Sequence, residues 1–522
     1  MRLVHPRLAC LVSLLLVASL PPSVHAQEIR EVARPRLAVA PDGGYAIAFE
    51  ALVEDISTAW HVAVQRYGPD AQPRGPLHLF DGESCGQFDI WTADGMFDPD
   101  LAFLSNGTLL IMMTHDGEWS VGSSGSFTAE STLGAITAQG ELMDLNSTGG
   151  CVQRKLIFPG GGTQRRPRLA IGPNDAIYLI HQGTFDGAHF TNVALRVLDQ
   201  EGNEVVEQFI PHADTRSQAS FHQYPDLAVS AQTTLVTWHQ CVLTDAQGST
   251  NDCDIGLQVF DTATGQPRGG NVAVNETGQG QPGTYSIWPT VAMNASGAAT
   301  IAWVDNRTGA QGDVFLQRYA PSGQPVGANI QVSLGQGTLQ DRPDVAMRDD
   351  GQFMVVWGDS SAAGFQARAR QFDALGQPIG APIILTEAPS GQPQVAAVAG
   401  GYLTTWLEAD AQGALAVRVQ PQAIRVSTEP RPEVPATTVT LSAYPNPFAG
   451  TTTVAYELDR PETVQVTVYD LLGRAVTRLV DTTQPAGSHV VRWNAAWQPP
   501  GLYLVVVETP TGRATQRVVV TR

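Results

Sequence analysis

Pro289-Thr290-Val291-Ala292 begins the unit that decides the fold of this 522-residue chain. A second apolar segment follows and ends at Trp303, a third runs into Arg318-Tyr319, and a turn that contains Gly closes the unit. The same order occurs seven times, with 50 to 68 residues between successive openings. The openings are Pro35-Arg36-Leu37-Ala38, Pro99-Asp100-Leu101-Ala102, Pro167-Arg168-Leu169-Ala170, Pro225-Asp226-Leu227-Ala228, Pro289-Thr290-Val291-Ala292, Pro343-Asp344-Val345-Ala346 and Pro393-Gln394-Val395-Ala396.

Each unit contains three expected strands and room for a fourth, although the third strand of the second unit has no clear place in the sequence. An antiparallel sheet of this size cannot bury both faces alone, but a neighbouring sheet on each side does so. Pro is expected at the first position of each unit's first strand, where a missing N–H costs least. The pattern predicts an all-β fold, a seven-bladed β-propeller with about 50–68 residues per blade. An elongated β-solenoid is the alternative, although its repeats are usually shorter.

The second strands are expected to end in large apolar side chains that wedge between neighbouring sheets. These ends lie near Phe49, Met113, Ile180, Trp238, Trp303, Trp357 and Trp406. The fifth unit, with Trp303-Val304-Asp305-Asn306-Arg307 and Asp313-Val314-Phe315-Leu316-Gln317-Arg318, resembles uncharacterised repeats of exported bacterial proteins. That resemblance supports the repeat architecture and implies no activity.

Composition agrees with a turn-rich β protein. Hydrophobic residues make up 43% and charged residues 16% of the chain, which has 51 Gly and 35 Pro. The formal net charge of −19 argues against nucleic acid and anionic membranes as partners.

The first 26 residues have the pattern of a secretory signal peptide. Arg2 and Arg7 are basic, Leu8–Leu20 is apolar, and Val24-His25-Ala26 is a small-residue cleavage site. Cleavage is expected near Ala26/Gln27. No later segment reaches the roughly 18 apolar residues of a spanning helix, so we expect no transmembrane segment.

Four cysteines remain after that cleavage: Cys85, Cys151, Cys241 and Cys253. An even number in an exported chain favours disulfides, and the spacing favours no metal site. Cys241 and Cys253 flank one expected hairpin loop, whereas Cys85 and Cys151 lie in connections between successive units. We therefore predict the pairs Cys241–Cys253 and Cys85–Cys151.

A Pro-rich stretch at 427–437 predicts a stiff linker between residues 27–426 and a second domain. Residues 438–522 contain short alternating strands, typical of a small β-sandwich. Its ordered elements are Tyr444-Pro445-Asn446-Pro447-Phe448, Val468-Tyr469-Asp470-Leu471-Leu472-Gly473-Arg474, Ala486-Gly487-Ser488-His489, Gly501-Leu502-Tyr503 and the last strand with Arg517.

These elements resemble the type A C-terminal sorting domain of proteins that the type IX secretion system exports. The resemblance implies a sorting signal made by Tyr444, Pro445, Asn446, Pro447, Phe448, Gly473, Gly501, Tyr503 and Arg517. It implies passage through the periplasm, contact with the type IX machinery, and a final place outside the cell or on its surface. It also implies removal of the tail, followed by surface attachment or release.

Seven residues, one before each repeated Pro, are expected to ring the mouth of a central channel. They are Arg34, Asp98, Arg166, Tyr224, Trp288, Arg342 and Gln392. Arginines pair with carboxylates, and the two aromatic residues lie in adjacent repeats, where they can stack on a sugar. This set is our candidate ligand site. The alternative is that the arginines pair with neighbouring aspartates and that the aromatic residues pack.

Other polar groups give weaker candidates. His115, His181 and His239 end three successive second strands, with His189 and His222 nearby and Asp305 and Asp359 at similar later positions. Equivalent positions on adjacent blades are too far apart for one metal ion, so we expect no metal site. The loop Asp245–Asp254 and the turn Asp349-Asp350-Gly351 leave structural calcium open, since neither has the spacing of a dedicated calcium loop. No other cofactor is expected.

Carboxylates could also supply a catalytic pair for glycoside hydrolysis. The candidates are Asp89, Asp94, Asp98, Asp100, Asp116 and Glu118. The aspartate boxes of sialidase propellers and a Gly-x-Ser-x-Gly elbow are both missing. Enzyme activity therefore stays open, but the sequence favours an exported binding or adhesion protein with a glycan or protein ligand. The alternatives are a glycan-degrading hydrolase or lyase and a structural cell-surface component.

Overall fold

The computed structural model describes residues 29–53, 60–80, 95–119, 126–143, 154–156, 164–183, 192–200, 202–209, 220–243, 250–276, 284–308, 312–333, 340–361, 364–409, 415–423, 441–458, 460–469, 475–496, 498–509 and 512–521. The chain divides into an N-terminal unit, Met1–Arg425, and a C-terminal unit, Val426–Arg522. The expected signal peptide, the Cys85–Cys151 pair, the 427–437 linker and Gly473 lie outside the described residues.

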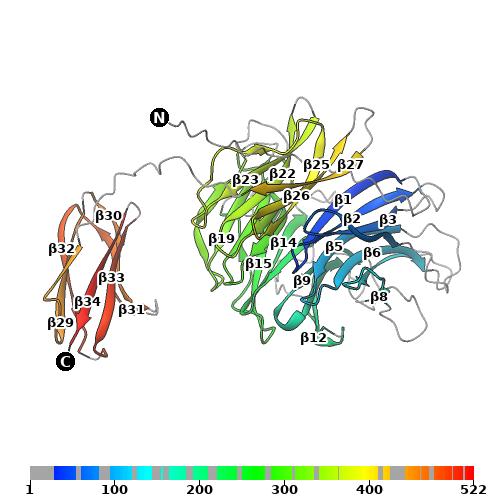
Figure 1. The fold of residues 1–522 in the computed structure, drawn as a ribbon. Coiled ribbons are helices and arrows are strands. Elements are labelled where there is room, and N and C mark those ends of the chain that lie inside the picture. The colour runs from blue at the N-terminus through cyan, green and yellow to red at the C-terminus, as the bar shows by residue number, and fades with distance from the viewer. Residues whose placement is uncertain are drawn as a thin grey trace, which may run out of the picture. The chain divides into compact units, whose positions relative to one another are not determined.

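The N-terminal unit is all-β and mostly antiparallel, with one group of strands for each sequence repeat (Figure 1). The first three groups are β1 (Ile29–Val39), β2 (Tyr45–Val53), β3 (Trp60–Tyr67) and β4 (Pro73–Phe80); β5 (Gly95–Phe103), β6 (Leu109–Trp119), β7 (Ser126–Ile136) and β8 (Arg154–Leu156); β9 (Gln164–Ile171), β10 (Ile177–Gly183), β11 (Asn192–Leu198) and β12 (Glu204–Phe209). Within the described ranges of the chain, the 3₁₀ turn η2 (Pro173–Asp175) is the one helical element.

The last four groups follow the same order. They are β13 (Ser220–Val229), β14 (Thr233–Leu243), β15 (Thr250–Asp261) and β16 (Val272–Ala273); β17 (Thr284–Met293), β18 (Ala299–Asp305), β19 (Asp313–Tyr319) and β20 (Pro325–Gln331); β21 (Gln340–Met347), β22 (Phe353–Ser361), β23 (Gly364–Phe372) and β24 (Ile383–Ile384); β25 (Ser390–Val398), β26 (Gly401–Ala409) and β27 (Leu415–Ala423). A short parallel pairing of β15 with β17 joins the fourth and fifth groups into one sheet.

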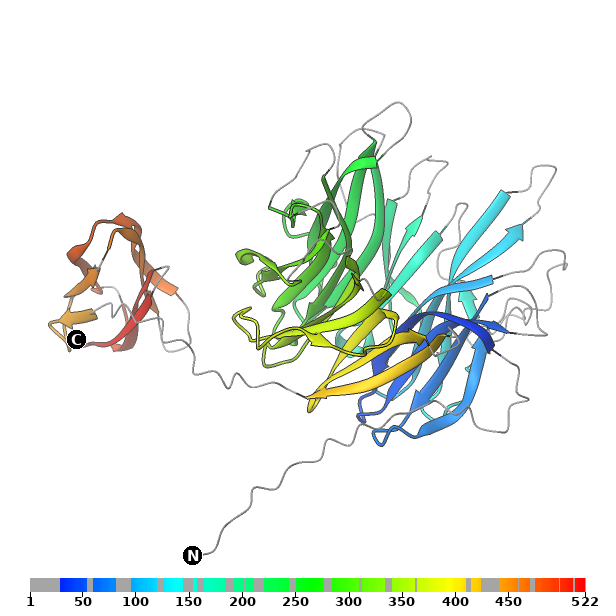
Figure 2. The same ribbon diagram turned by 90° about the horizontal axis from the view of Figure 1, so that it is seen from above.

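The first strands of the seven groups contact one another in a closed ring. Each of β1, β5, β9, β13, β17, β21 and β25 contacts the first strand of the next group, and β25 contacts β1. The first and last groups, blue and yellow in Figures 1 and 2, therefore lie side by side. The first strands thus surround a common axis.

Apolar side chains fill the space between each pair of neighbouring groups. Trp238 packs with residues of the third group, and Trp303 packs with residues of the fourth. Trp238 is fully buried and lies across the strand pair from Gly256, where an added Cβ would stand 2.6 Å from the indole Cε2. Trp238 therefore covers Gly256 of its own sheet and packs against the neighbouring third group.

The expected position of the repeated Pro was wrong. Each first strand begins three to six residues before its Pro, so that Pro lies within the strand. The pairing with the second strand shifts register around all seven prolines, from the Ala33/Arg36 shift to the Gly391/Gln394 shift. A bulge accepts Pro in mid-strand because a bulged residue donates no N–H hydrogen bond to the neighbouring strand.

Fourth strands are present in the first six groups, and the second group has a clear third strand, β7. Within the described residues, the seventh group has three strands. Cys241 and Cys253 face each other on β14 and β15 and form a disulfide.

The C-terminal unit has two sheets that share one apolar core. One sheet has the order β28 (Leu441–Tyr444), β29 (Thr451–Leu458), β32 (Gly487–Asn494), and the other the order β31 (Ala475–Gln484), β30 (Glu462–Tyr469), β33 (Gly501–Thr509), β34 (Gly512–Val520). The core includes Trp493 and Tyr503. No helix of the described residues is long and apolar enough to cross a membrane.

The Tyr444–Phe448 segment holds the last strand of this unit. The Asn446 side chain donates a hydrogen bond to the Arg517 carbonyl (2.7 Å) and accepts one from the Val519 N–H (2.8 Å). Phe448 is buried in the core, whereas Tyr444 is 81% exposed. The motif residues therefore join the start of the unit to its end.

Candidate ligand-binding cavity

All seven candidate residues line one cavity of about 240 Å³ that the ring of first strands surrounds. We call this set the upper tier: Arg34, Asp98, Arg166, Tyr224, Trp288, Arg342 and Gln392. The residues that follow each Pro line the same cavity and form the lower tier: Arg36, Asp100, Arg168, Asp226, Thr290, Asp344 and Gln394. The upper-tier residues lie within the first strands and not just before them, because each first strand begins ahead of its Pro.

Every upper-tier residue has a left-handed backbone, with φ between 34° and 55°. Such φ values are uncommon outside glycine and are strained for β-branched side chains. None of the seven is β-branched. The bulge at each Pro imposes this conformation and re-aims the side chain.

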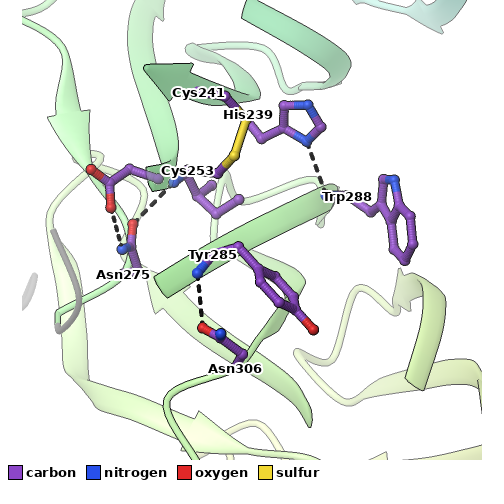
Figure 3. The surroundings of a disulfide bond; sticks show 9 residues. His239, Cys241, Cys253, Asn275, Tyr285, Trp288 and Asn306 are labelled. Carbon is purple, nitrogen blue, oxygen red and sulfur yellow. Dashed lines mark hydrogen bonds between the residues drawn. A yellow bond between two sulfur atoms is a disulfide. The ribbon is translucent and has the colours of Figure 1, made fainter. Parts of the chain in front are cut away.

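Polar side chains of the preceding group satisfy several of the bulged N–H groups. The pairs are Asp98 N–H to Glu50 Oε1 (2.8 Å), Tyr224 N–H to Gln182 Oε1 (2.8 Å), Trp288 N–H to His239 Nδ1 (3.4 Å) and Arg34 N–H to Gln392 Oε1 (2.7 Å). Figure 3 shows the His239–Trp288 contact beside the disulfide. Sequence reasoning missed Glu50 and Gln182. They accept these N–H groups only because the fold brings each of them next to the bulge of the following repeat.

The lower-tier aspartates join neighbouring groups in the same way. They lie in the second, fourth and sixth repeats, and each accepts a 2.8 Å hydrogen bond from the next repeat: Asp100 from Leu169 N–H, Asp226 from Val291 N–H and Asp344 from Val395 N–H. Because seven is odd, the seventh and first repeats meet without an aspartate, and there Arg36 donates to the Gln394 side chain. The sequence feature that could have predicted this network is the residue after each Pro, which is Asp in the second, fourth and sixth repeats.

Burial changes the protonation of these groups. Burial raises the pKa of Asp226 to about 6, and the nearby Asp100 and Asp344 carboxylates add to that rise. Arg168 and the Val291 N–H act in the opposite direction. Burial raises the pKa of Asp344 as well.

Arg34 forms an ion pair with two carboxylates. Its Nη1 lies 2.9 Å from Glu50 Oε1 and 2.9 Å from Asp98 Oδ1. Two carboxylates thus face this guanidinium, as the packing alternative anticipates.

Arg166 and Arg342 lie over aromatic rings. The Arg166 Cζ is 3.3 Å from the centroid of the Tyr224 ring, and the Arg342 Cζ is 5.9 Å from that of Trp288. The two rings meet edge to face, with centroids 6.3 Å apart. The pKa of Arg166 is lowered to about 10, chiefly by burial and also by the charges of Arg342 and Arg168, whereas Tyr224 and Asp98 oppose the change.

The histidines are separate from one another. His181 Nδ1 lies 3.2 Å from the Gln182 carbonyl oxygen, and His239 contacts the bulge of the next repeat. Burial lowers the pKa of both to about 3, so both are neutral at pH 7. In the part of the chain that the structure describes, no group of three or more His, Cys, Asp or Glu could hold a metal ion. The His115 side chain and His189 lie outside that part.

The remaining polar candidates have local partners. Asp305 accepts hydrogen bonds from Ser286 (3.0 Å) and Trp303 (3.1 Å), and Asp359 pairs with Arg368 at 2.7 Å. His222 Nδ1 is 3.2 Å from the Asn192 amide oxygen. The Asp349–Gly351 turn is held by hydrogen bonds such as Gln352 N–H to Asp350 Oδ1 at 3.0 Å. Asp245, Asp89 and Asp94 lie outside the described residues, as do the side chains of Asp116 and Glu118.

Comparison with known proteins identifies the C-terminal module. Residues 442–521 match the family model of the secretion system C-terminal sorting domain, which confirms the resemblance to type IX sorting domains. This match indicates export to the cell surface or the extracellular space. No curated protein matches the chain.

Solved structures resemble the N-terminal part at low identity. An ulvan lyase of a new polysaccharide lyase family has a TM-score of 0.50 and 12% identity, over 76% of this chain and 94% of that one. A protein of unknown function from Dyadobacter fermentans has a TM-score of 0.41 and 10% identity, over 75% and 95%. An intramolecular trans-sialidase from Ruminococcus gnavus has a TM-score of 0.40 and 9% identity, over 78% and 97%. At such identities the likeness concerns the fold alone.

Proposed function

We propose that this protein is an exported, non-enzymatic binding protein whose central cavity receives a glycan. Residues 27–426 form a seven-bladed β-propeller that presents the cavity. Residues 438–522 form a β-sandwich that passes the chain to the type IX machinery, after a signal peptide cleaved near Ala26/Gln27 has taken it to the periplasm. The closed ring of first strands and the shared core of the C-terminal sheets support this architecture.

One observation carries the binding role: two aromatic rings and two guanidinium groups meet on one side of the cavity. Tyr224 and Trp288 come from adjacent repeats, and Arg166 and Arg342 lie over their rings. Aromatic faces bind the apolar faces of sugars, and guanidinium groups donate several hydrogen bonds in one plane. The cavity offers both aromatic surface and polar hydrogen-bond donors, as sites for small ligands do.

The carboxylates of the cavity favour binding over catalysis. Asp100, Asp226 and Asp344 each accept a backbone N–H from the next repeat, and Glu50 is held by Asp98 N–H and Arg34. These groups join the sheets to one another. A general acid or base must instead reach the substrate proton.

A glycan array tests the proposal. The purified protein, without its signal peptide but with its C-terminal unit, should bind a subset of glycans, and Trp288→Ala should lose most of that binding because the stacking ring is gone. Tyr444→Ala is the matched control, since this ring is 81% exposed in the C-terminal unit. Absence of binding by the parent protein would overturn the proposal.

A glycan-degrading hydrolase or lyase is the second candidate, and Asp226 is the observation that favours it. Its pKa of about 6 lies in the range of a general acid that works near neutral pH. Incubation with mixed polysaccharides distinguishes the two, because only an enzyme produces new reducing ends or unsaturated products. A structural surface role would instead show as lost surface integrity when the gene is deleted, with no glycan bound.

A further inference from the structure

The upper tier contains three arginines and one aspartate. Arg34 is paired with both Asp98 and Glu50. Arg166 has no hydrogen bond or ion pair with any of the described residues, and it lies against the face of the Tyr224 ring. A guanidinium that stacks by its face keeps its N–H donors in the plane, available to an acceptor.

The cost of this arrangement points to a missing partner. Arg166 is half-buried, and the charges of Arg342 and Arg168 oppose its own. The Asp98 carboxylate favours the charge of Arg166 but is paired with Arg34. A desolvated cation without a paired anion is unfavourable. An anion between Arg166 and Arg342 would relieve the repulsion between them.

We infer that Arg166 and Arg342 bind the anionic group of an acidic saccharide, either a uronate carboxylate or a sulfate ester. This inference rests on the proposed glycan-binding function and names the class of glycan. Tyr224 and Trp288 flank the anion and contact the sugar ring that carries it.

The lower tier sets how deep the anion enters. It presents three carboxylates, Asp100, Asp226 and Asp344, and two guanidinium groups, Arg36 and Arg168. Like charges repel, and they do so more strongly away from bulk water. The three lower-tier carboxylates therefore disfavour an anion beside them, and we expect the anion beside the aromatic rings of the upper tier.

Calorimetric titration of the protein without its signal peptide but with its C-terminal unit tests the inference with simple anions and a matched pair of glycans. The anions are sulfate and acetate, at constant ionic strength maintained with chloride. The glycans are oligogalacturonate and its uncharged methyl ester. Each is titrated into the parent, Arg166→Gln, Arg342→Gln and the control Arg478→Gln, an exposed arginine of the C-terminal unit that pairs with Asp481 at 2.7 Å.

Sulfate or acetate should bind the parent saturably at one site, and Arg166→Gln and Arg342→Gln should each weaken that binding by about 10-fold or more. Arg478→Gln should leave it unchanged. The inference is overturned if neither anion binds the parent, or if binding is unchanged in both cavity variants. If the anions bind through Arg166 but no oligosaccharide or arrayed glycan does, the anion site stands and the glycan function fails. If the acid and its ester bind equally well and Arg166→Gln does not weaken that binding, the glycan function stands and the anion site fails.

Discussion

Replacement of Asp226 by Asn should change how the stability of the protein depends on pH. Asp226 lines the lower tier, where its carboxylate accepts hydrogen bonds from Leu227 N–H (3.0 Å) and Val291 N–H (2.8 Å). Burial raises its pKa from 3.8 to about 6. The folded chain therefore holds this proton at pH values where the unfolded chain has released it.

The sign follows from proton linkage. Between pH 4 and 6 the folded state binds more protons than the unfolded state, so the contribution of Asp226 to stability falls as pH rises. Its protonated form carries no penalty below pH 4. A rise of about two pKa units corresponds to at most about 3 kcal/mol above pH 6, less where water in the cavity screens the charge.

Asp226→Asn keeps the shape and removes the charge. The amide has one acceptor oxygen, so one of the two N–H groups loses its hydrogen bond at every pH, which costs about 1–3 kcal/mol. It also removes the pH-dependent penalty. Relative to the parent, the variant should gain up to about 3 kcal/mol in its free energy of unfolding between pH 4 and pH 7.

Urea denaturation at pH 4, 5, 6 and 7, followed by tryptophan fluorescence, measures this difference. Asp261→Asn is a control of opposite sign, since the hydrogen bond from Arg268 lowers the pKa of the exposed Asp261. The stability that Asp261 contributes is present at high pH and lost as pH falls. Parallel curves for the parent and Asp226→Asn from pH 4 to 7 would refute the reasoning.

Three further changes test the packing and the termini. Gly256→Ala should destabilise the N-terminal unit by about 1–3 kcal/mol in urea denaturation, because the added Cβ would stand 2.6 Å from buried Trp238. Joint replacement of Cys241 and Cys253 by Ser should cost about 3 kcal/mol, since the bond closes a loop with a sequence separation of 12. Asn446→Ala removes two hydrogen bonds to β34, so amide hydrogen exchange at Val519 should become about 10-fold faster.

Each of these changes has a contrary result. Gly270→Ala, whose added Cβ meets nothing within 4 Å, is the control for Gly256, and equal effects of the two would contradict the Trp238 contact. A reducing agent that lowers the stability of the Ser variant as much as that of the parent would show another disulfide at work. Unchanged exchange at Val519 would mean that Asn446 does not hold the last strand.

Repeat spacing and residue type predicted a large part of this structure. The Pro-x-hydrophobic-Ala openings marked the first strands, and the recurring Trp marked the contact between neighbouring sheets. The residues before each Pro, from Arg34 to Gln392, all line one cavity. A seven-fold repeat predicts such convergence because equivalent residues of a closed ring face the same axis.

The position of Pro within its strand was not predictable in this way. A Pro before an apolar triplet predicts the start of a strand. The residues that precede it also pair with the second strand, but their sequence shows no clear strand pattern. The bulge exists because side chains such as Glu50 and Gln182, distant in sequence, accept the N–H groups that it frees.

The sequence by itself determined the number of repeats, the identity of the C-terminal sorting module and the set of residues on the axis, because each depends on residue type and spacing. Only the tertiary structure decided which charges are neutralised. Arg34 meets Glu50 and Asp98, whereas Arg166 lies on Tyr224 without an ion pair among the described residues. The seven residues have similar sequence contexts. Their electrostatic energies depend on the distances between charges and on burial. The sequence does not give these quantities, because they are set only when the ring of repeats closes.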